Sequence, residues 1–244
     1  MATGDVIVKD AFEHLKAILD TPEKIEARKK AHPYCQECLT GCNKKFYVGS
    51  QPERRAREYC LERGDPECVG IYTQEDYEFG YQQLKKDGYN LTLEEIKGFL
   101  NPSFWLSTNV TLKGKEFSPF WYQDRALRCT SKKMVLRMSR RAGKSELLAG
   151  RCVHRLFNSK HTYYRMLVIC PAKAQAKELW DKITDYLSSN PDLNNSVVLK
   201  RTPYYEVLIP ANGNYVRIFT AGSKSGNQAM SVRGQSGNEV ILDE

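Results

Sequence analysis

A basic loop that follows an apolar run is the feature that most constrains how this chain can fold. Residues 134–136 are Met-Val-Leu, residues 139–145 read Ser-Arg-Arg-Ala-Gly-Lys-Ser, and helix formers occupy residues 146–149. A strand that runs into a small loop ending in Gly-Lys-Ser, followed by a helix, places backbone N–H groups and a helix N-terminus around phosphate oxygens. The pattern therefore predicts a P-loop in which Lys144 reaches the β- and γ-phosphates of a nucleotide and Ser145 holds Mg²⁺.

A second apolar run, residues 240–242, ends in Asp243 and Glu244. Such a strand supplies a carboxylate for the metal, here Asp243, and a base for the attacking water, here Glu244. Taken alone, Gly-Lys-Ser is also an ordinary helix start, and two acids can simply cap a buried strand. Met138 stands where the common P-loop pattern has its first glycine. The prediction therefore depends on the order and spacing of the two segments.

The first part of the chain has helical periodicity. We expect two amphipathic helices within residues 10–30, separated by a turn at Thr21 and Pro22, a helix over residues 74–86, and a capped helix that starts at Thr92 and ends near Asn101. Between them, residues 32–69 are rich in glycine, proline and cysteine and show little periodicity. The sequence therefore predicts a small helical, cysteine-containing region over residues 1–110.

From residue 117 onward, strand patterns alternate with helix patterns. A helix is expected over residues 172–187, and strands are expected over residues 134–136, 166–170, 197–199, 206–209, 215–219 and 240–242. This alternation predicts an α/β fold, a P-loop NTPase domain over residues 111–244 with a mostly parallel sheet. Because no strand follows Glu244, we expect the sheet to be incomplete at its C-terminal side, as in a truncated chain, one half of a split gene or a product interrupted by an intervening sequence.

Composition and charge narrow the class of protein. The 244 residues include no apolar stretch long enough to span a membrane and no N-terminal secretion signal, so we expect a cytoplasmic protein. In that compartment the eight cysteines are better interpreted as thiols or metal ligands than as disulfides. The formal net charge of +8 is compatible with a polyanion such as DNA, although basic pairs are also common on solvated surfaces.

Four segments together resemble one family. They are residues 117–123 (Phe-Ser-Pro-Phe-Trp-Tyr-Gln), the loop 139–145, residues 170–176 after a predicted strand, and residues 219–223 with 231–236 leading into the acidic strand. In this order they resemble the large terminase subunit, the ATPase motor that packages DNA into the capsids of tailed bacteriophages. The family's P-loop often lacks the first glycine and often carries arginine, so Met138 agrees with it. The resemblance covers residues 117–244.

The resemblance implies a RecA-like (ASCE) fold and a role for each matching residue. Gln123 would contact adenine, Arg140 would neutralise charge on the phosphoryl oxygens, and Glu244 would orient or activate the water. Ser145 and Asp243 would hold Mg²⁺. Gln123 could instead be an ordinary surface amide, and Arg140 or Arg141 could simply contact solvent or a neighbouring acid. The full set of expected ATP-binding residues is Gln123, Ser139, Arg140, Arg141, Ala142, Gly143, Lys144 and Ser145.

The same resemblance implies partners and a location. Double-stranded DNA, a portal protein and a small terminase subunit would be the partners, the complete protein would form a homo-oligomeric ring, and the site of action would be the cytoplasm of an infected host cell. The family's nuclease domain does not lie within this chain.

A cysteine cluster suggests a structural zinc site. Four thiolates, or three with one imidazole, could stabilise a loop-rich region that has few apolar side chains, although a second Cys-x-x-Cys pair is missing. The candidate ligands are His32, Cys35, Cys38, Cys42, Cys60 and Cys68. The remaining cysteines, Cys129, Cys152 and Cys170, are expected to be buried small apolar residues.

Two alternative functions remain open at the level of sequence. A helicase-like DNA-dependent ATPase would share the base-reading glutamine and the Asp-Glu strand. A catalytically silent fragment would combine an ATP-binding half-domain with a zinc-stapled binding module, and would bind ATP without turnover.

Overall fold

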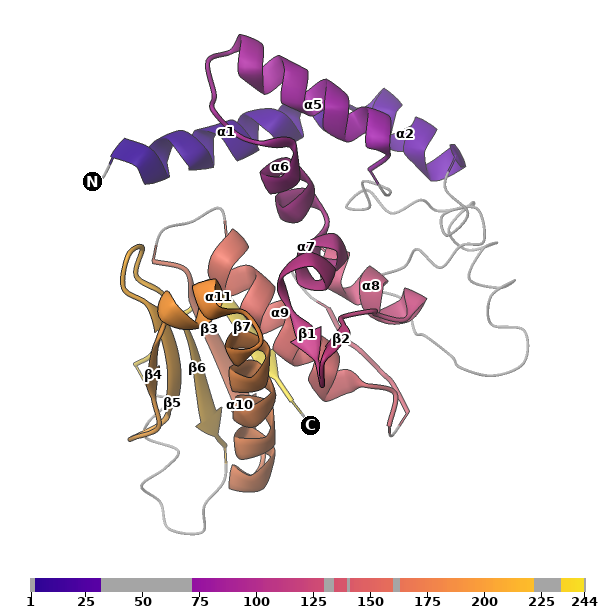
Figure 1. The fold of residues 1–244 in the computed structure, drawn as a ribbon. Coiled ribbons are helices and arrows are strands. Elements are labelled where there is room, and N and C mark those ends of the chain that lie inside the picture. Colours follow the sequence, from indigo (N-terminus) through magenta and orange to yellow (C-terminus); the bar gives the residue numbers. More distant parts are fainter. Residues whose placement is uncertain are drawn as a thin grey trace. The chain divides into compact units, whose positions relative to one another are not determined.

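The computed structural model describes residues 3–31, 72–129, 134–139, 141–159, 163–221 and 234–243. These residues form two compact units, one comprising Met1–Trp105 with Pro119–Lys144 and the other Leu106–Ser118 with Ser145–Glu244. Figure 1 labels the elements. The chain passes from one unit to the other after Trp105, after Ser118 and after Lys144. The division predicted from the sequence, residues 1–110 and 111–244, stays a prediction. No helix in the described ranges is long and apolar enough to cross a membrane.

The first unit is helical. Both helices expected within residues 10–30 are present, and the helix expected over residues 74–86 has those bounds. The elements of this unit are α1 (Thr3–Leu19), α2 (Pro22–Ala31), α5 (Gln74–Lys86), α6 (Leu93–Leu100), the start of α7 (Pro102–Asn109) and α8 (Trp121–Arg128).

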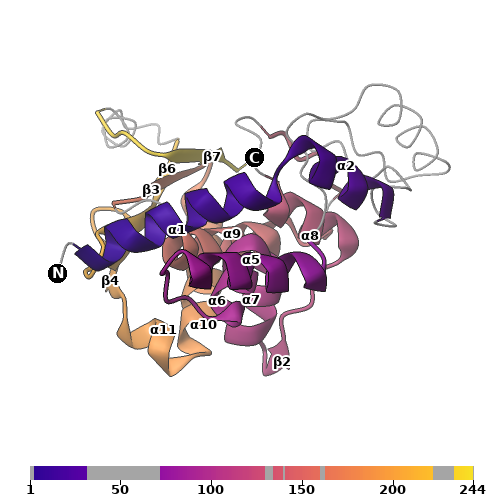
Figure 2. The ribbon, with the colours of Figure 1, turned by 90° about the horizontal axis from the view of Figure 1, so that it is seen from above.

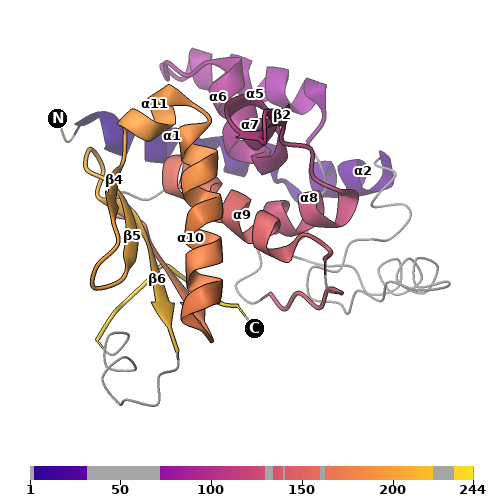
Figure 3. The ribbon, with the colours of Figure 1, turned by 60° about the horizontal axis from the view of Figure 1, so that its bottom comes forward.

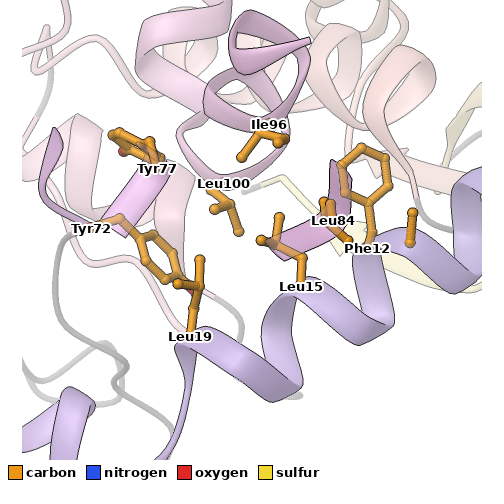
Figure 4. Packing of buried hydrophobic residues seen from close by; sticks show 9 residues of the cluster. Phe12, Leu15, Leu19, Tyr72, Tyr77, Leu84, Ile96 and Leu100 are labelled. Atoms are coloured by element: carbon orange, nitrogen blue, oxygen red, sulfur yellow. The ribbon is translucent and has the colours of Figure 1, made fainter. Parts of the chain in front are cut away.

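The core of the first unit forms where α1, α5 and α6 meet. The apolar positions of α1 recur at helical spacing, so one stripe of the helix is buried. Figure 4 shows this cluster, and its members are Ala11, Phe12, Leu15, Leu19, Tyr72, Tyr77, Leu84, Ile96 and Leu100. α1 and α5 lie side by side (Figure 2). They approach closely at Gly80, where a Cβ would overlap with the Leu15 side chain.

A buried arginine joins the start of this unit to its core. Arg28 is only 4% exposed, and its guanidinium donates to the Leu19 carbonyl at 2.7 Å and to the Asp20 carboxylate at 2.8 Å. The same group lies over the ring of Tyr72, whose hydroxyl donates to Asp20. The charge of Arg28 is therefore compensated, which is the condition for burying it.

Two capping boxes explain where α5 and α6 begin. In each, a threonine hydroxyl accepts the N–H of the third helical residue, and the carboxylate of that residue accepts the N–H of the threonine. At α6 the partners are Thr92 and Glu95, at 3.2 and 2.7 Å. The helix start predicted at Thr92 is confirmed.

Replacing Thr92 with alanine should lower the free energy of unfolding by about 1 kcal/mol, because one backbone N–H of α6 loses its acceptor. Urea denaturation would measure the change. Thr92→Ser keeps the hydroxyl and is the matched control. An equal loss in both variants would contradict the capping role.

The second unit contains a five-stranded mixed sheet. Its elements are the end of α7, β1 (Thr111–Leu112), β2 (Lys115–Glu116), α9 (Lys144–Asn158), β3 (Arg165–Cys170), α10 (Lys173–Ser188), α11 (Pro191–Asn195), β4 (Val198–Lys200), β5 (Tyr205–Ile209), β6 (Asn214–Thr220) and β7 (Glu239–Leu242). The strand order is β4-β5-β6-β3-β7. β3 pairs in parallel with β6 and β7, whereas β4, β5 and β6 pair antiparallel. Figure 3 shows the sheet beside α10.

The strand register shows which face of the sheet α9 and α10 cover. Tyr205, Asn214 and Glu239 share one face by their pairing through β6 and β3. The ring of Trp180 on α10 stacks on Tyr205 at 5.2 Å, and the Asn214 amide donates to the Leu156 carbonyl of α9 at 3.0 Å. Both helices therefore pack on this face.

One expectation about the fold is wrong. Residues 134–139 are described but form no strand, and Val135 is 80% exposed, so the strand expected before the loop is absent from the described sheet. Directly after the helix end predicted near Asn101, a further helix, α7, begins at Pro102, because proline is well suited to the first helical position. The predicted parallel pairing is present between β3, β6 and β7, and β4, β5 and β6 add an antiparallel part, so the sheet is mixed. The remaining predicted strands and the helix over residues 172–187 are present within one or two residues.

Candidate nucleotide-binding site

The predicted phosphate loop has an unusual backbone. Arg141 and Gly143 both have positive φ, at 64° and 74°, and α9 begins at the next residue, Lys144. The N–H of Ala142 donates to the Ser139 carbonyl at 3.4 Å, which closes the turn. In a loop of this kind, left-handed and right-handed residues alternate before the helix begins. Successive backbone N–H groups then point toward one side, and the concave surface that they form binds anions.

Helix α8 holds this loop from within the same unit. The Tyr122 hydroxyl donates to the Ala142 carbonyl at 3.2 Å, and the Gln123 amide donates to the Gly143 carbonyl at 3.2 Å. The side-chain oxygen of Gln123 accepts the N–H of Phe120 at 2.9 Å. Gln123 is thus not a surface amide, since it is 6% exposed and has a partner at each end.

In the second unit, Glu146 in the first turn of α9 is held by α10. Lys182 forms a salt bridge with one carboxylate oxygen, and the Tyr186 hydroxyl donates to the other at 2.8 Å. Burial and the hydrogen bond to Glu146 raise the pKa of Tyr186, so its hydroxyl remains a donor across the physiological range. These contacts fix the helix just after Ser145.

Asp243 follows β7, which pairs in parallel with β3. The backbone N–H of Asp243 donates to the Ile169 carbonyl at 3.0 Å, which continues the parallel ladder one residue beyond the strand. Burial and the charge of Asp243 raise the pKa of the Cys170 thiol to about 11. Asp243 therefore lies at the carboxyl end of the parallel strands, which is where open α/β sheets bind ligands.

A partly buried charge pair connects α9 to β7. Arg151 donates to Glu239 at 2.6 Å, and the Tyr164 hydroxyl donates to the other oxygen of Glu239 at 2.7 Å. Burial alone would raise the pKa of Glu239, but Arg151 and Tyr164 lower it below its ordinary value. The helix that follows the predicted phosphate loop is thus anchored to the strand that precedes Asp243.

Several predicted site residues lie outside the described residues. They are Arg140, Glu244, and the candidate zinc ligands His32, Cys35, Cys38, Cys42, Cys60 and Cys68. Within the described ranges, no three His, Cys, Asp or Glu side chains are grouped so that they could hold a metal ion. Cys129, Cys152 and Cys170 are buried thiols, as expected.

The chemistry of Ser145 and Asp243 suits Mg²⁺ bound together with a nucleotide. Mg²⁺ usually takes one or two protein carboxylates and completes its shell with water and substrate phosphates. One hydroxyl and one carboxylate are therefore enough protein ligands for a nucleotide-bound Mg²⁺. A group of three or more protein ligands, as a structural zinc ion needs, is not required.

Sequence reasoning missed Tyr122, Arg151 and Glu239. Tyr122 lies beside Gln123, within the segment that resembles the terminase adenine-recognition segment, and this proximity is a signal in the sequence. Arg151 and Glu239 are 88 positions apart in the chain, and opposite charges at that separation give no local pattern.

The chain was compared with known protein families, curated proteins and solved structures. No protein-family model matches the sequence, and no curated protein matches it. The crystal structure of the HK97 bacteriophage large terminase aligns with 60% of this chain at 18% sequence identity, with a TM-score of 0.48. The alignment covers 31% of the terminase chain, so this chain matches less than a third of that protein.

Proposed function

We propose that this chain binds ATP with Mg²⁺ and hydrolyses it as the ATPase part of a motor that moves double-stranded DNA into a viral capsid. The observation that carries the nucleotide site is the loop in which Arg141 and Gly143 are left-handed and α9 begins at Lys144. This backbone offers N–H groups and a helix N-terminus next to a lysine, in the order that a triphosphate requires.

In this proposal each residue has a distinct task. The backbone of the loop from Ser139 to Gly143 cradles the phosphates, and the Lys144 ammonium pairs with the β- and γ-phosphates. Ser145 and Asp243 would hold Mg²⁺, which neutralises charge on the phosphate oxygens when it is bound. Arg140 would stabilise charge that develops on the transferred group, and Glu244 would orient the attacking water.

The motor role rests on the sequence resemblance of residues 117–244 and on the charge of the chain. A net charge of +8 favours contact with a phosphate backbone, since each lysine or arginine contact releases counterions. This role requires three kinds of protein partner: a portal protein, a small terminase subunit and further copies of this chain. Zinc in the cysteine-containing region would serve to stabilise that region.

Lys144→Ala should weaken ATP binding by about 10- to 100-fold, because a charge-assisted contact to the phosphates is lost. Titration calorimetry with MgATP on the purified chain measures the affinity. Lys86 is exposed in the last turn of α5, so Lys86→Ala is the matched control and should bind ATP normally. Unchanged affinity in Lys144→Ala would contradict the site.

Turnover separates the proposed motor from its alternatives. Hydrolysis that double-stranded DNA stimulates supports the motor, whereas stimulation by single strands alone would favour the helicase-like function. ATP binding with no hydrolysis, with or without DNA, would identify a silent ATP-binding module.

A further inference from the structure

Helix α8 contacts two consecutive carbonyl groups of the phosphate loop. Tyr122 donates to the Ala142 carbonyl and Gln123 donates to the Gly143 carbonyl, both at 3.2 Å. Adjacent side chains of one short helix thus bind adjacent peptide units of the loop. We call these two hydrogen bonds the carbonyl clamp.

The orientation of the Gln123 amide follows from its neighbours. Its oxygen is required at the Phe120 N–H, which can only donate, and its NH₂ group is required at the Gly143 carbonyl, which can only accept. The opposite orientation would place two donors together at one end and two acceptors at the other. Because the side chain is also 6% exposed, the amide is held in one direction by both contacts.

Fixing the carbonyls of a loop also fixes its N–H groups. In a trans peptide, the C=O of one residue and the N–H of the next point in opposite directions. The carbonyl of Ala142 shares its peptide plane with the N–H of Gly143, and the carbonyl of Gly143 shares its plane with the N–H of Lys144. By holding both carbonyls, α8 turns these two N–H groups away from itself.

We infer that Tyr122 and Gln123 are positioning residues that orient the phosphate-binding N–H groups of Gly143 and Lys144 through the carbonyl clamp. Their contribution is made to the phosphates and is independent of the base. In the described conformation both ends of the Gln123 amide are engaged with the protein, and the side chain is almost completely buried. This inference rests on the proposal that the loop binds nucleotide phosphates.

The inference is tested by a ligand that has phosphates and no base. We would measure the affinity of the full chain for MgATP, MgGTP and magnesium tripolyphosphate, in wild type, Tyr122→Phe and Gln123→Met. Each variant should weaken all three ligands by a similar factor, about fivefold for one lost hydrogen bond. The ratio of ATP to GTP affinity should stay unchanged. Tyr163→Phe alters an exposed tyrosine elsewhere and should leave all three affinities as they are.

The outcomes distinguish the clamp from other roles. Weaker ATP binding in Gln123→Met with unchanged tripolyphosphate binding would overturn the inference and identify Gln123 as an adenine reader. A lower melting temperature with unchanged affinities would overturn it as well, since the contacts would then serve stability alone. If Gln123→Met fails to fold, Tyr122→Phe still provides the test, because it removes only the hydroxyl group that donates to the Ala142 carbonyl. Absence of all binding in wild type would refute the proposed function itself.

Discussion

Arg151→Met should lower the free energy of unfolding by about 3 kcal/mol at neutral pH, because it leaves the largely desolvated Glu239 carboxylate without its closest positive partner. Arg151 and Glu239 are 11% and 18% exposed at their side chains, so water compensates little. Two partners of Glu239 remain in the variant, namely Arg155 at 3.9 Å and the Tyr164 hydroxyl. They keep the loss of stability below that expected for a fully isolated charge. Urea denaturation would measure the change.

The effect of Arg151→Met should depend on pH. In wild type the folded-state pKa of Glu239 is below its ordinary value, so its stabilising contribution is present above that ordinary value and is lost as the pH falls through the lowered one. In the variant, burial becomes the main influence and raises the folded-state pKa above the unfolded one. The folded state then takes up a proton more readily, so the deficit relative to wild type should shrink as the pH falls.

Two further variants complete this test. Arg201 is exposed, and Arg201→Met should leave stability nearly unchanged. Arg151→Met combined with Glu239→Leu replaces the pair by apolar groups and should recover most of the loss, because the uncompensated charge is removed. A deficit in Arg151→Met that is small, or that does not change with pH, would show that the pair contributes little.

Local patterns predicted those elements whose signals are contained in a few neighbouring residues. The capping box of Thr92 and Glu95 marks the start of α6. The apolar run within β3 indicates a buried strand, whichever strands it pairs with. α9 and α10 were predicted for the same reason, since helix periodicity and the helix N-terminus after Gly143 are local features.

Features that depend on distant partners could not be predicted. The apolar residues at 134–136 look like a strand, but a strand needs a neighbour, and the described sheet offers them none. The antiparallel pairing of β4 with β5 is different, because the two strands are close in the chain and residues 197–199 and 206–209 look like a short strand pair in the sequence. At the site, the sequence predicted the loop, Ser145 and Asp243, but their assignment as ligands stays a prediction. The contacts of Tyr122 and Gln123 with the loop become visible only in three dimensions.

Gly143→Ala should weaken nucleotide binding on the order of 30-fold, through two effects at one position. At a φ of 74° an alanine is strained by about 1–2 kcal/mol, which disfavours the bound form of the loop. The new Cβ would also overlap with the amide nitrogen of Gln123, so that side chain would have to leave the Gly143 carbonyl. The affinity for MgATP, measured by calorimetry, would report both effects.

A glycine of similar backbone angle provides the control. Gly88 has a φ of 85°, and a Cβ there would meet nothing within 4 Å. Gly88→Ala should therefore lower stability by a comparable strain and leave the affinity for MgATP unchanged. Reduced affinity in this control would mean that general destabilisation explains the loss.

Combining Gly143→Ala with Gln123→Met tests whether the two residues act through one contact. If the alanine already opens the carbonyl clamp, Gln123→Met has nothing further to remove, and the double variant should bind MgATP no more weakly than Gly143→Ala. Independent roles would give additive losses, with the double variant about fivefold weaker again. The effects of substitutions on binding free energy are expected to be coupled for residues in contact and additive for distant residues. Additive losses here would therefore show that Gln123 does not act through the phosphate loop, and would favour a contact with the base.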